Sequence, residues 1–131
     1  ILAPLEDALE RLHEAVRQED PYGVAQLDTE FHRTLCRLSN NDVLLRLWEP
    51  LARQLTIIFG LSTLRKDLDV IAREHDELLS GLQGGDMDQI AKLVRVHIFD
   101  YTRALDYEEL VTAHRSERNK SRTDKRQQEK A

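Results

Sequence analysis

The spacing of the apolar residues is the feature that most constrains the fold of this chain. Through most of residues 1–112, Leu, Ile, Val and Phe recur at intervals of three and four residues, as in Leu5, Leu9, Leu12 and Val16. This spacing places them on one face of an α-helix, whereas a half-buried strand would alternate apolar and polar residues. Aromatic residues make up only 5% of the chain, which also disfavours a β sandwich. We therefore predict an all-α fold, an antiparallel bundle of about five to six helices.

Capping and helix-breaking residues divide this pattern into segments. Asp20-Pro21 is typical of a helix start, and Gly84-Gly85 followed by Asp86 indicates one helix end and the next helix start. Pro50 lies within a predicted helix, where we expect it to cause a kink. The expected helices are 4–19, 21–39, 43–60, 68–83 and 86–107.

Charge divides the chain into two parts. Residues 1–112 hold 12 Lys and Arg against 21 Asp and Glu, and residues 113–131 hold 7 against 3. We interpret 1–112 as one helical domain, too acidic to bind nucleic acid by itself. The segment 113–131 has no Leu, Ile, Val or aromatic residue, so we expect a basic, disordered tail.

Composition also bears on the cellular location. No stretch of about 20 apolar residues could span a membrane, and no signal peptide is evident. Cys36 is the one cysteine, so disulfides within the chain are excluded. We expect a soluble, cytoplasmic protein without a membrane partner. Because the first residue is Ile rather than Met, we also expect a piece of a longer polypeptide.

Four polar residues fall on or beside the apolar stripes of the predicted helices. His75 and His97 lie at stripe centres, while Asp28 and His32, spaced i and i+4, border the stripe of the second helix. An unpaired polar group buried there would cost about 1–3 kcal/mol, and a carboxylate more. A shared divalent metal would satisfy all four groups. This ligand set suits zinc, which we favour, or Ni, Mn or Fe, with one or two coordination positions open.

The alternative is a purely structural role, in which each of these histidines is a hydrogen-bonded core residue without a metal. The other two histidines do not join the group. His13 shares no clear apolar face and His114 begins the tail, so we expect both to be solvated.

Four segments in this order and spacing carry a resemblance to a known family. They are residues 27–35, 38–44, 73–86 and 95–98, which include the pair Asp28-x-x-x-His32 and the sequence Arg73-Glu-His-Asp-Glu-Leu-Leu. Together they resemble the FCD domain, the C-terminal effector domain of FadR-like GntR transcription regulators, over residues 5 to about 105. The resemblance implies a FadR C-terminal-domain-like bundle.

The resemblance also implies a function and its residues. Asp28, His32, His75 and His97 would hold the divalent metal, a small carboxylate would complete its coordination as the effector, and the domain would form a homodimer. Such regulators carry a winged helix-turn-helix ahead of this domain. It does not fit before Leu5, so we expect DNA binding only through a domain outside this chain. Candidate effector-binding residues are Gln54, Arg65 and Tyr101.

Two other classes of protein remain as alternatives. A metal-dependent hydrolase would need a general base, for which Glu74, beside His75, is the candidate. A metal-free helical dimerisation module would use the leucine stripes as an interface. The sequence favours an effector sensor over an enzyme.

Overall fold

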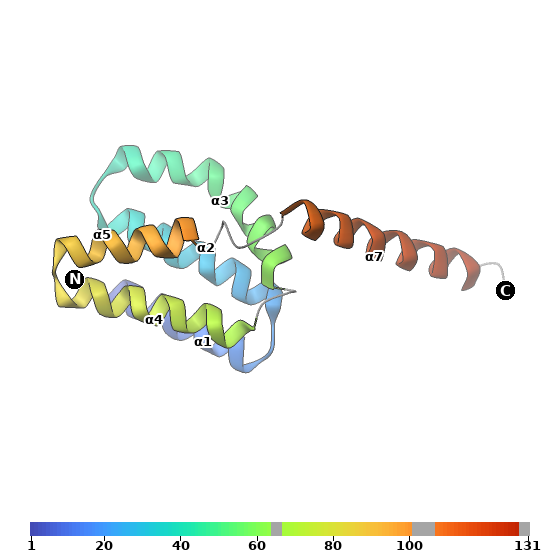
Figure 1. Ribbon diagram of the computed structural model, residues 1–131, viewed down its shortest axis with the longest axis horizontal. Helices are drawn as coiled ribbons and strands as arrows, with labels where there is room; N and C mark the ends of the chain where they lie inside the picture. Colours follow the sequence, from blue (N-terminus) through green and yellow to red (C-terminus); the bar gives the residue numbers. More distant parts are fainter. Residues whose placement is uncertain (64–66, 101–106, 129–131) are drawn as a thin grey trace.

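The computed structural model describes residues 1–63, 67–100 and 107–128. Within these ranges the chain forms helices only, which confirms the all-α prediction (Figure 1). The elements are α1 (Ala3–Arg17), α2 (Pro21–Leu38), α3 (Asp42–Thr63), α4 (Leu68–Gly84), α5 (Met87–Arg95), the π-helical turn η1 (Val96–Asp100) and α7 (Tyr107–Gln128). None of the described helices is both long enough and apolar enough to cross a membrane.

The predicted caps define the helix boundaries. The carboxylate of Asp20 accepts a hydrogen bond from the Gly23 N–H, and that of Asp86 accepts from the N–H groups of Asp88 and Gln89. Gly85 ends α4 in the left-handed conformation, with φ of 72°. These are the two boundaries that the sequence marks most clearly.

The core lies between α1, α2 and α4. Helix α1 contacts both α2 and α4, α2 also contacts α3, and α4 contacts α5 (Figure 1). The largest fully buried side chains are Phe31, Leu5, Leu12, His75 and Val24. One histidine therefore belongs to the centre of the core, as its position in the apolar stripe predicts.

Helix α3 has the expected bend, whereas α5 is shorter than the predicted helix. Helix α3 continues to Thr63 with Pro50 inside it, and it changes direction along its length (Figure 1), because proline removes a backbone donor and clashes with the preceding turn. Helix α5 ends at Arg95 and passes into η1. The rest of the predicted 86–107 helix includes 101–106, which lie outside the described residues.

The tail differs from the prediction. Instead of disorder from residue 113, the structure has α7 through Gln128, which projects away from the bundle (Figure 1). Its described side chains are almost all exposed, and α3 is the element that it contacts most. The segment is rich in Arg, Lys, Glu and Gln and lacks Gly and Pro. This composition favours a helix over the disorder that we predicted.

Candidate metal centre

Three elements bring the four predicted ligands together. Asp28 and His32 lie one turn apart on α2, while His75 comes from α4 and His97 from η1. One ring nitrogen from each of the three histidines lies within 4.8 Å of the others. Asp28 and His75 are buried, and His32 and His97 are half-buried. The cluster thus lies at the edge of the core.

The shortest contacts within the cluster have the length expected between adjacent ligands of a metal ion. Asp28 Oδ1 lies 3.2 Å from His75 Nε2 and 3.3 Å from His32 Nε2, and His32 Nε2 lies 3.1 Å from His97 Nε2. Zinc ligands lie about 2.0–2.1 Å from the ion, which puts adjacent ligand atoms roughly 3.0–3.4 Å apart. The three histidine nitrogens therefore match the chemistry of a divalent metal site, and Asp28 lies beside two of them.

A backbone hydrogen bond orients the most buried ligand. His75 Nδ1–H donates to the Ile71 carbonyl at 2.8 Å, so Nε2 is the nitrogen left to bind a cation or a proton. Phe31 meets the same ring edge-on, with the ring centroids 4.9 Å apart. Hydrogen bonding of the second ring nitrogen is the usual way in which proteins fix a metal-binding histidine.

Electrostatics also favour a cation at this point. Burial raises the pKa of Asp28, but the charge of His75 and hydrogen bonds from His32 and His75 outweigh burial and hold that pKa well below its usual range. Burial lowers the pKa of His75, yet attraction to Asp28 raises it above the ordinary value overall. The ionised carboxylate thus stabilises positive charge beside it, whether a proton or a metal supplies that charge.

A largely apolar cavity opens beside the cluster. Its volume is about 120 Å³. Among the described residues, its walls comprise the four candidate ligands, Glu74 and the apolar or aromatic side chains Trp48, Leu55, Phe59, Ile71 and Ile98. Apolar walls around a few polar groups are typical of small-molecule sites.

The three predicted effector residues have different outcomes. Gln54 is exposed on α3 and is not among the described residues that line the cavity. Arg65 and Tyr101 lie outside the described residues. Trp48, Leu55 and Phe59, which were not among the predicted effector residues, do line the cavity. Their spacing on one face of α3 was the available signal.

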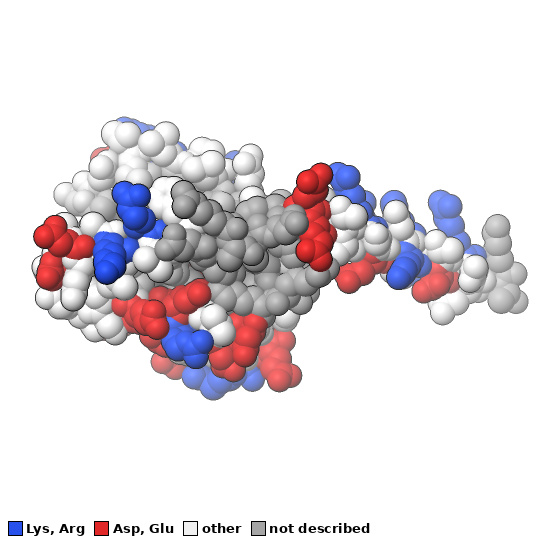
Figure 2. All heavy atoms as spheres, in the orientation of Figure 1, with Lys and Arg blue, Asp and Glu red and all other residues white. Residues whose placement is uncertain are grey.

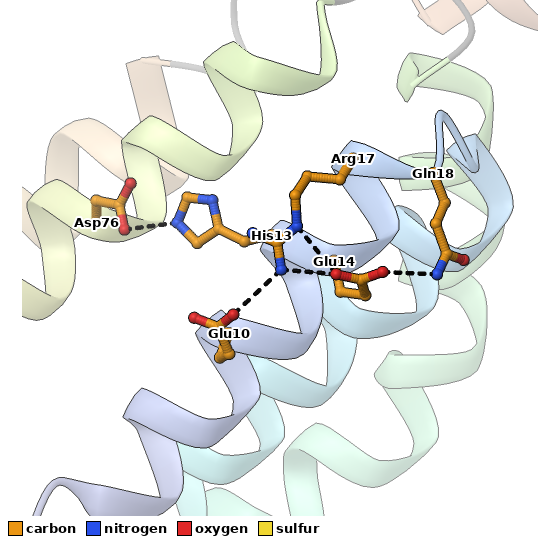
Figure 3. Close-up of polar contacts among 6 residues, drawn as sticks. All are labelled: Glu10, His13, Glu14, Arg17, Gln18 and Asp76. Atoms are coloured by element: carbon orange, nitrogen blue, oxygen red, sulfur yellow. Dashed lines mark hydrogen bonds and ion pairs between the residues drawn. The ribbon is translucent and has the colours of Figure 1, made fainter.

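His13, predicted to be solvated, instead links α1 to α4. Its Nε2 lies 2.8 Å from Asp76 Oδ1, and both side chains are partly exposed (Figure 3). Nearby, Arg17 pairs with Glu10 and Glu14 along the exposed face of α1 (Figure 3). Because Asp76 directly follows His75, the pair ties the helix that carries a candidate ligand to α1.

The charged side chains on the visible face follow the division seen in the sequence. Acidic side chains gather along the lower part of the bundle with a few basic ones among them, whereas basic and acidic groups intermix along α7 (Figure 2). This face of the bundle shows no continuous basic surface of the kind that duplex DNA requires.

Two comparisons with known proteins found a match. The family model described as the FCD domain matches residues 1–100. The chain is similar to a probable D-xylose utilization operon transcriptional repressor from Paenarthrobacter nicotinovorans, with 27% identity over 97 residues. The aligned part covers 74% of this chain and 43% of the relative, so the chain spans less than half of that protein's length. No solved structure matches the chain significantly.

Proposed function

Because this chain belongs to the FCD domain family, we propose that it is the metal-containing, effector-sensing domain of a transcription regulator. The observation that carries this proposal is the convergence of His32, His75 and His97, with Asp28 in contact with two of them, beside a largely apolar cavity. In this proposal the four side chains hold one divalent ion, with zinc favoured over Ni, Mn or Fe.

The effector in this proposal is a small organic acid. When bound, a divalent ion supplies a Lewis-acidic centre with open positions for a carboxylate oxygen. Leu55, Phe59 and Ile98 then surround the apolar part of the acid and exclude water from it. The relative is named as a probable repressor of a D-xylose utilization operon. Only its general class, that of transcription regulators, enters this proposal.

Regulation in this proposal is a shift between arrangements of a homodimer. The site joins α2, α4 and η1, so a ligand that binds one relative arrangement of these elements more tightly stabilises it. DNA binding would belong to a winged helix-turn-helix in a part of the regulator outside this chain. The acidic composition of residues 1–112 supports this separation of roles.

The test combines metal analysis with thermal unfolding. We expect about one divalent ion per chain in protein purified without chelators. Acetate, lactate, malate, citrate and gluconate are then tested on zinc-loaded and chelated protein. A ligand at about 100 Kd adds roughly 2.7 kcal/mol of stability, which is readily measured as a rise in Tm. Absence of metal together with no response to added zinc would reject the site, and carboxylate binding that ignores chelation would reject the effector role.

A metal-dependent hydrolase is the second candidate function, since Glu74 lines the same cavity next to His75. A carboxylate in this position could accept a proton from a metal-activated water. Turnover of model ester and amide substrates by the zinc-loaded protein, abolished by Glu74→Gln, would favour the enzyme. The absence of turnover together with carboxylate binding would favour the sensor.

A further inference from the structure

Helix α7 carries a row of cations along one of its sides. At 3.6 residues per turn, five basic side chains lie within an arc of about 100° around the helix axis. We call this row the basic face, and its members are Arg115, Arg118, Arg122, Lys125 and Arg126. Three of them follow one another at intervals of four residues, so each cation stands one turn from the next. The positive charge of α7 is therefore concentrated on one side.

The acidic side chains of the same segment lie on another side of α7. Glu117 and Asp124 are roughly 130–150° around the helix from the centre of the basic face, and Lys120 lies with them. Most of the Lys and Arg of α7 lie along its upper edge in Figure 2, and the acidic side chains beyond its first turn lie along its lower edge. Glu108 shares the direction of the basic face but lies about two turns before Arg115. The two signs thus alternate along the helix but are separated around it.

The cations of the basic face are exposed, and none has an ion pair or a side-chain hydrogen bond within the described part of the chain. Like charges one turn apart repel each other. Helix α7 projects away from the acidic bundle (Figure 1), and salt screens charges more than about 10 Å apart. The basic face therefore remains available to a partner that carries closely spaced negative charges.

The composition around the basic face narrows the kind of partner. Residues 115–128 contain no Leu, Ile, Val, Met or aromatic residue. A membrane surface would need an apolar face, a protein interface would need apolar or aromatic anchors, and single-stranded nucleic acid is bound largely by stacking on aromatic rings.

The phosphate backbone of a duplex needs none of these features. It is bound by cations, of which Arg also offers paired donors, and by Ser, Thr, Asn and Gln as further donors. Apart from Glu117 and Asp124, residues 115–128 consist of these residue types and Lys. Charge and composition together favour duplex DNA.

We propose that the basic face of α7 binds the phosphate backbone of duplex DNA without reading its sequence. Arg115 and Arg126 lie about 16 Å apart along the helix axis, enough to cross a major groove about 12 Å wide and reach phosphates on both sides. This contact goes beyond the proposed function, in which operator recognition belongs to a domain outside this chain. It also departs from the expectation that all DNA contacts lie in that domain.

Fluorescence anisotropy of a labelled duplex of about 20 base pairs, titrated with the full chain at about 20–100 mM salt, tests the proposal. We expect log Kobs to fall with the logarithm of the salt concentration with a slope of about −4, as for release of counterions from four to five phosphates. Two duplexes of unrelated sequence should bind within about twofold of each other, because their backbones are alike. A single strand of the same length should bind at least about fivefold more weakly.

Arg122→Gln and Lys120→Gln form a matched pair, because each removes one positive charge from the middle of α7 but from opposite sides. Both residues are exposed and Gln is a good helix former, so circular dichroism should show unchanged helix content. We expect Arg122→Gln to weaken duplex binding by about tenfold near 50 mM salt and to reduce the salt slope by about 1. Lys120→Gln should change the affinity by less than about threefold and leave the slope as it is.

The outcomes assign the basic face to one partner or reject it. Absence of salt-dependent duplex binding by the wild-type chain would reject the proposal, and equal effects of the two substitutions would reject the basic face as the binding surface. Equal or tighter binding of the single strand would reject a duplex partner. Poly-glutamate that binds at least as tightly as the duplex would indicate an acidic protein instead, and tighter binding to phosphatidylglycerol vesicles would indicate a membrane surface.

The metal-sensor proposal can be judged separately from this one. Helix α7 supplies none of the four candidate metal ligands, so chelation should leave duplex binding unchanged. Failure of duplex binding would leave the sensor proposal in place, and absence of metal would leave the DNA contact in place. Loss of duplex binding on chelation would contradict a contact made by α7 alone.

Discussion

At the scale of single residues, the four candidate ligands have different environments. Asp28 Oδ1 is shared between His32 and His75, whereas His97 meets the rings of both of these histidines. His75 is 2% exposed and hydrogen-bonded to the backbone, while His97 is half-buried on η1. Loss of Asp28 or His75 would therefore disturb the core as well as the metal site, but loss of His97 would affect mainly the metal.

We predict that His97→Ala weakens zinc binding by more than the roughly 10–100-fold that loss of an outer hydrogen-bond partner to a ligand usually costs. The metal-linked rise in Tm should shrink accordingly, because it depends on zinc affinity. The metal-free Tm should change little. Competition with a chromophoric chelator and thermal unfolding measure both quantities.

His13→Ala is the matched control for this prediction. It also removes an imidazole, but the His13 contact is with Asp76 outside the cluster, so zinc affinity should stay at the wild-type value. Equal zinc affinity in His97→Ala and His13→Ala would contradict the assignment of His97 as a ligand.

The same residues predict opposite pH trends with and without metal. The depressed pKa of Asp28 stabilises the metal-free fold above about pH 4, the unfolded value, and this stabilisation is lost as the pH falls toward the folded value. The raised pKa of His75 stabilises the metal-free fold below about pH 6.5 and is lost as the pH rises through the folded value. The pair therefore contributes most between these two limits.

Zinc requires neutral imidazoles, so its contribution should grow as the pH rises. We predict that the zinc-induced increase in Tm is larger at about pH 7.5 than at about pH 5.5. Chelated protein measured at both values is the control. An increase in Tm that is equal at both pH values would show that no imidazole is deprotonated on binding.

At the scale of elements, short capping signals in the sequence predicted where helices begin and end. The sequence was a poorer guide to the type of helix and to the helix in the tail. Asp20 and Asp86 cap their helices as expected, and Gly85 ends α4, because these effects depend on a few adjacent residues. The π-helical turn that carries His97 was not predicted, since an extra residue in one turn barely changes the apolar spacing. The helix in the tail was missed because the prediction considered burial and gave too little weight to propensity.

The link between α4 and α5 offers a matched pair of glycines. Gly85 has φ of 72°, where a Cβ is strained, whereas Gly84 is helical and a Cβ there would meet nothing within 4 Å. We predict that Gly85→Ala lowers the free energy of unfolding by about 1–2 kcal/mol. Gly84→Ala should leave it unchanged or raise it by up to about 1 kcal/mol. Denaturant unfolding of both variants checks this, and equal effects would reject the left-handed conformation at Gly85.

At the scale of the whole molecule, the candidate site depends on packing between helices that are distant in sequence. The proximity of His32, His75 and His97 was predictable because a polar group on or beside an apolar stripe stands out in the sequence. The cavity was not, since it depends on how α3, bent and packed on α2, presents Trp48 and Phe59 toward α4 and η1.

The exposed surface of the whole chain also supports the homodimer in our proposed function. Val43, Leu47 and Leu51 recur at four-residue intervals on α3, and each is more than half exposed. Apolar side chains gathered along one helix face typically mark an interface. In our proposed function a second copy of the chain covers this stripe, because two-fold homodimers use the same surface of both subunits.

We therefore predict that Leu47→Lys converts a dimer into a monomer in sedimentation equilibrium. A buried lysine without a partner would be desolvated at the interface, whereas in the monomer it would remain in water. The fold and zinc affinity should be retained, since Leu47 is 62% exposed within one chain and does not line the cavity. Met87→Lys places the same charge at another exposed apolar residue, on α5, and should remain dimeric. Dimers of unchanged affinity in Leu47→Lys would place the interface elsewhere, and a monomeric wild-type protein would contradict the homodimer.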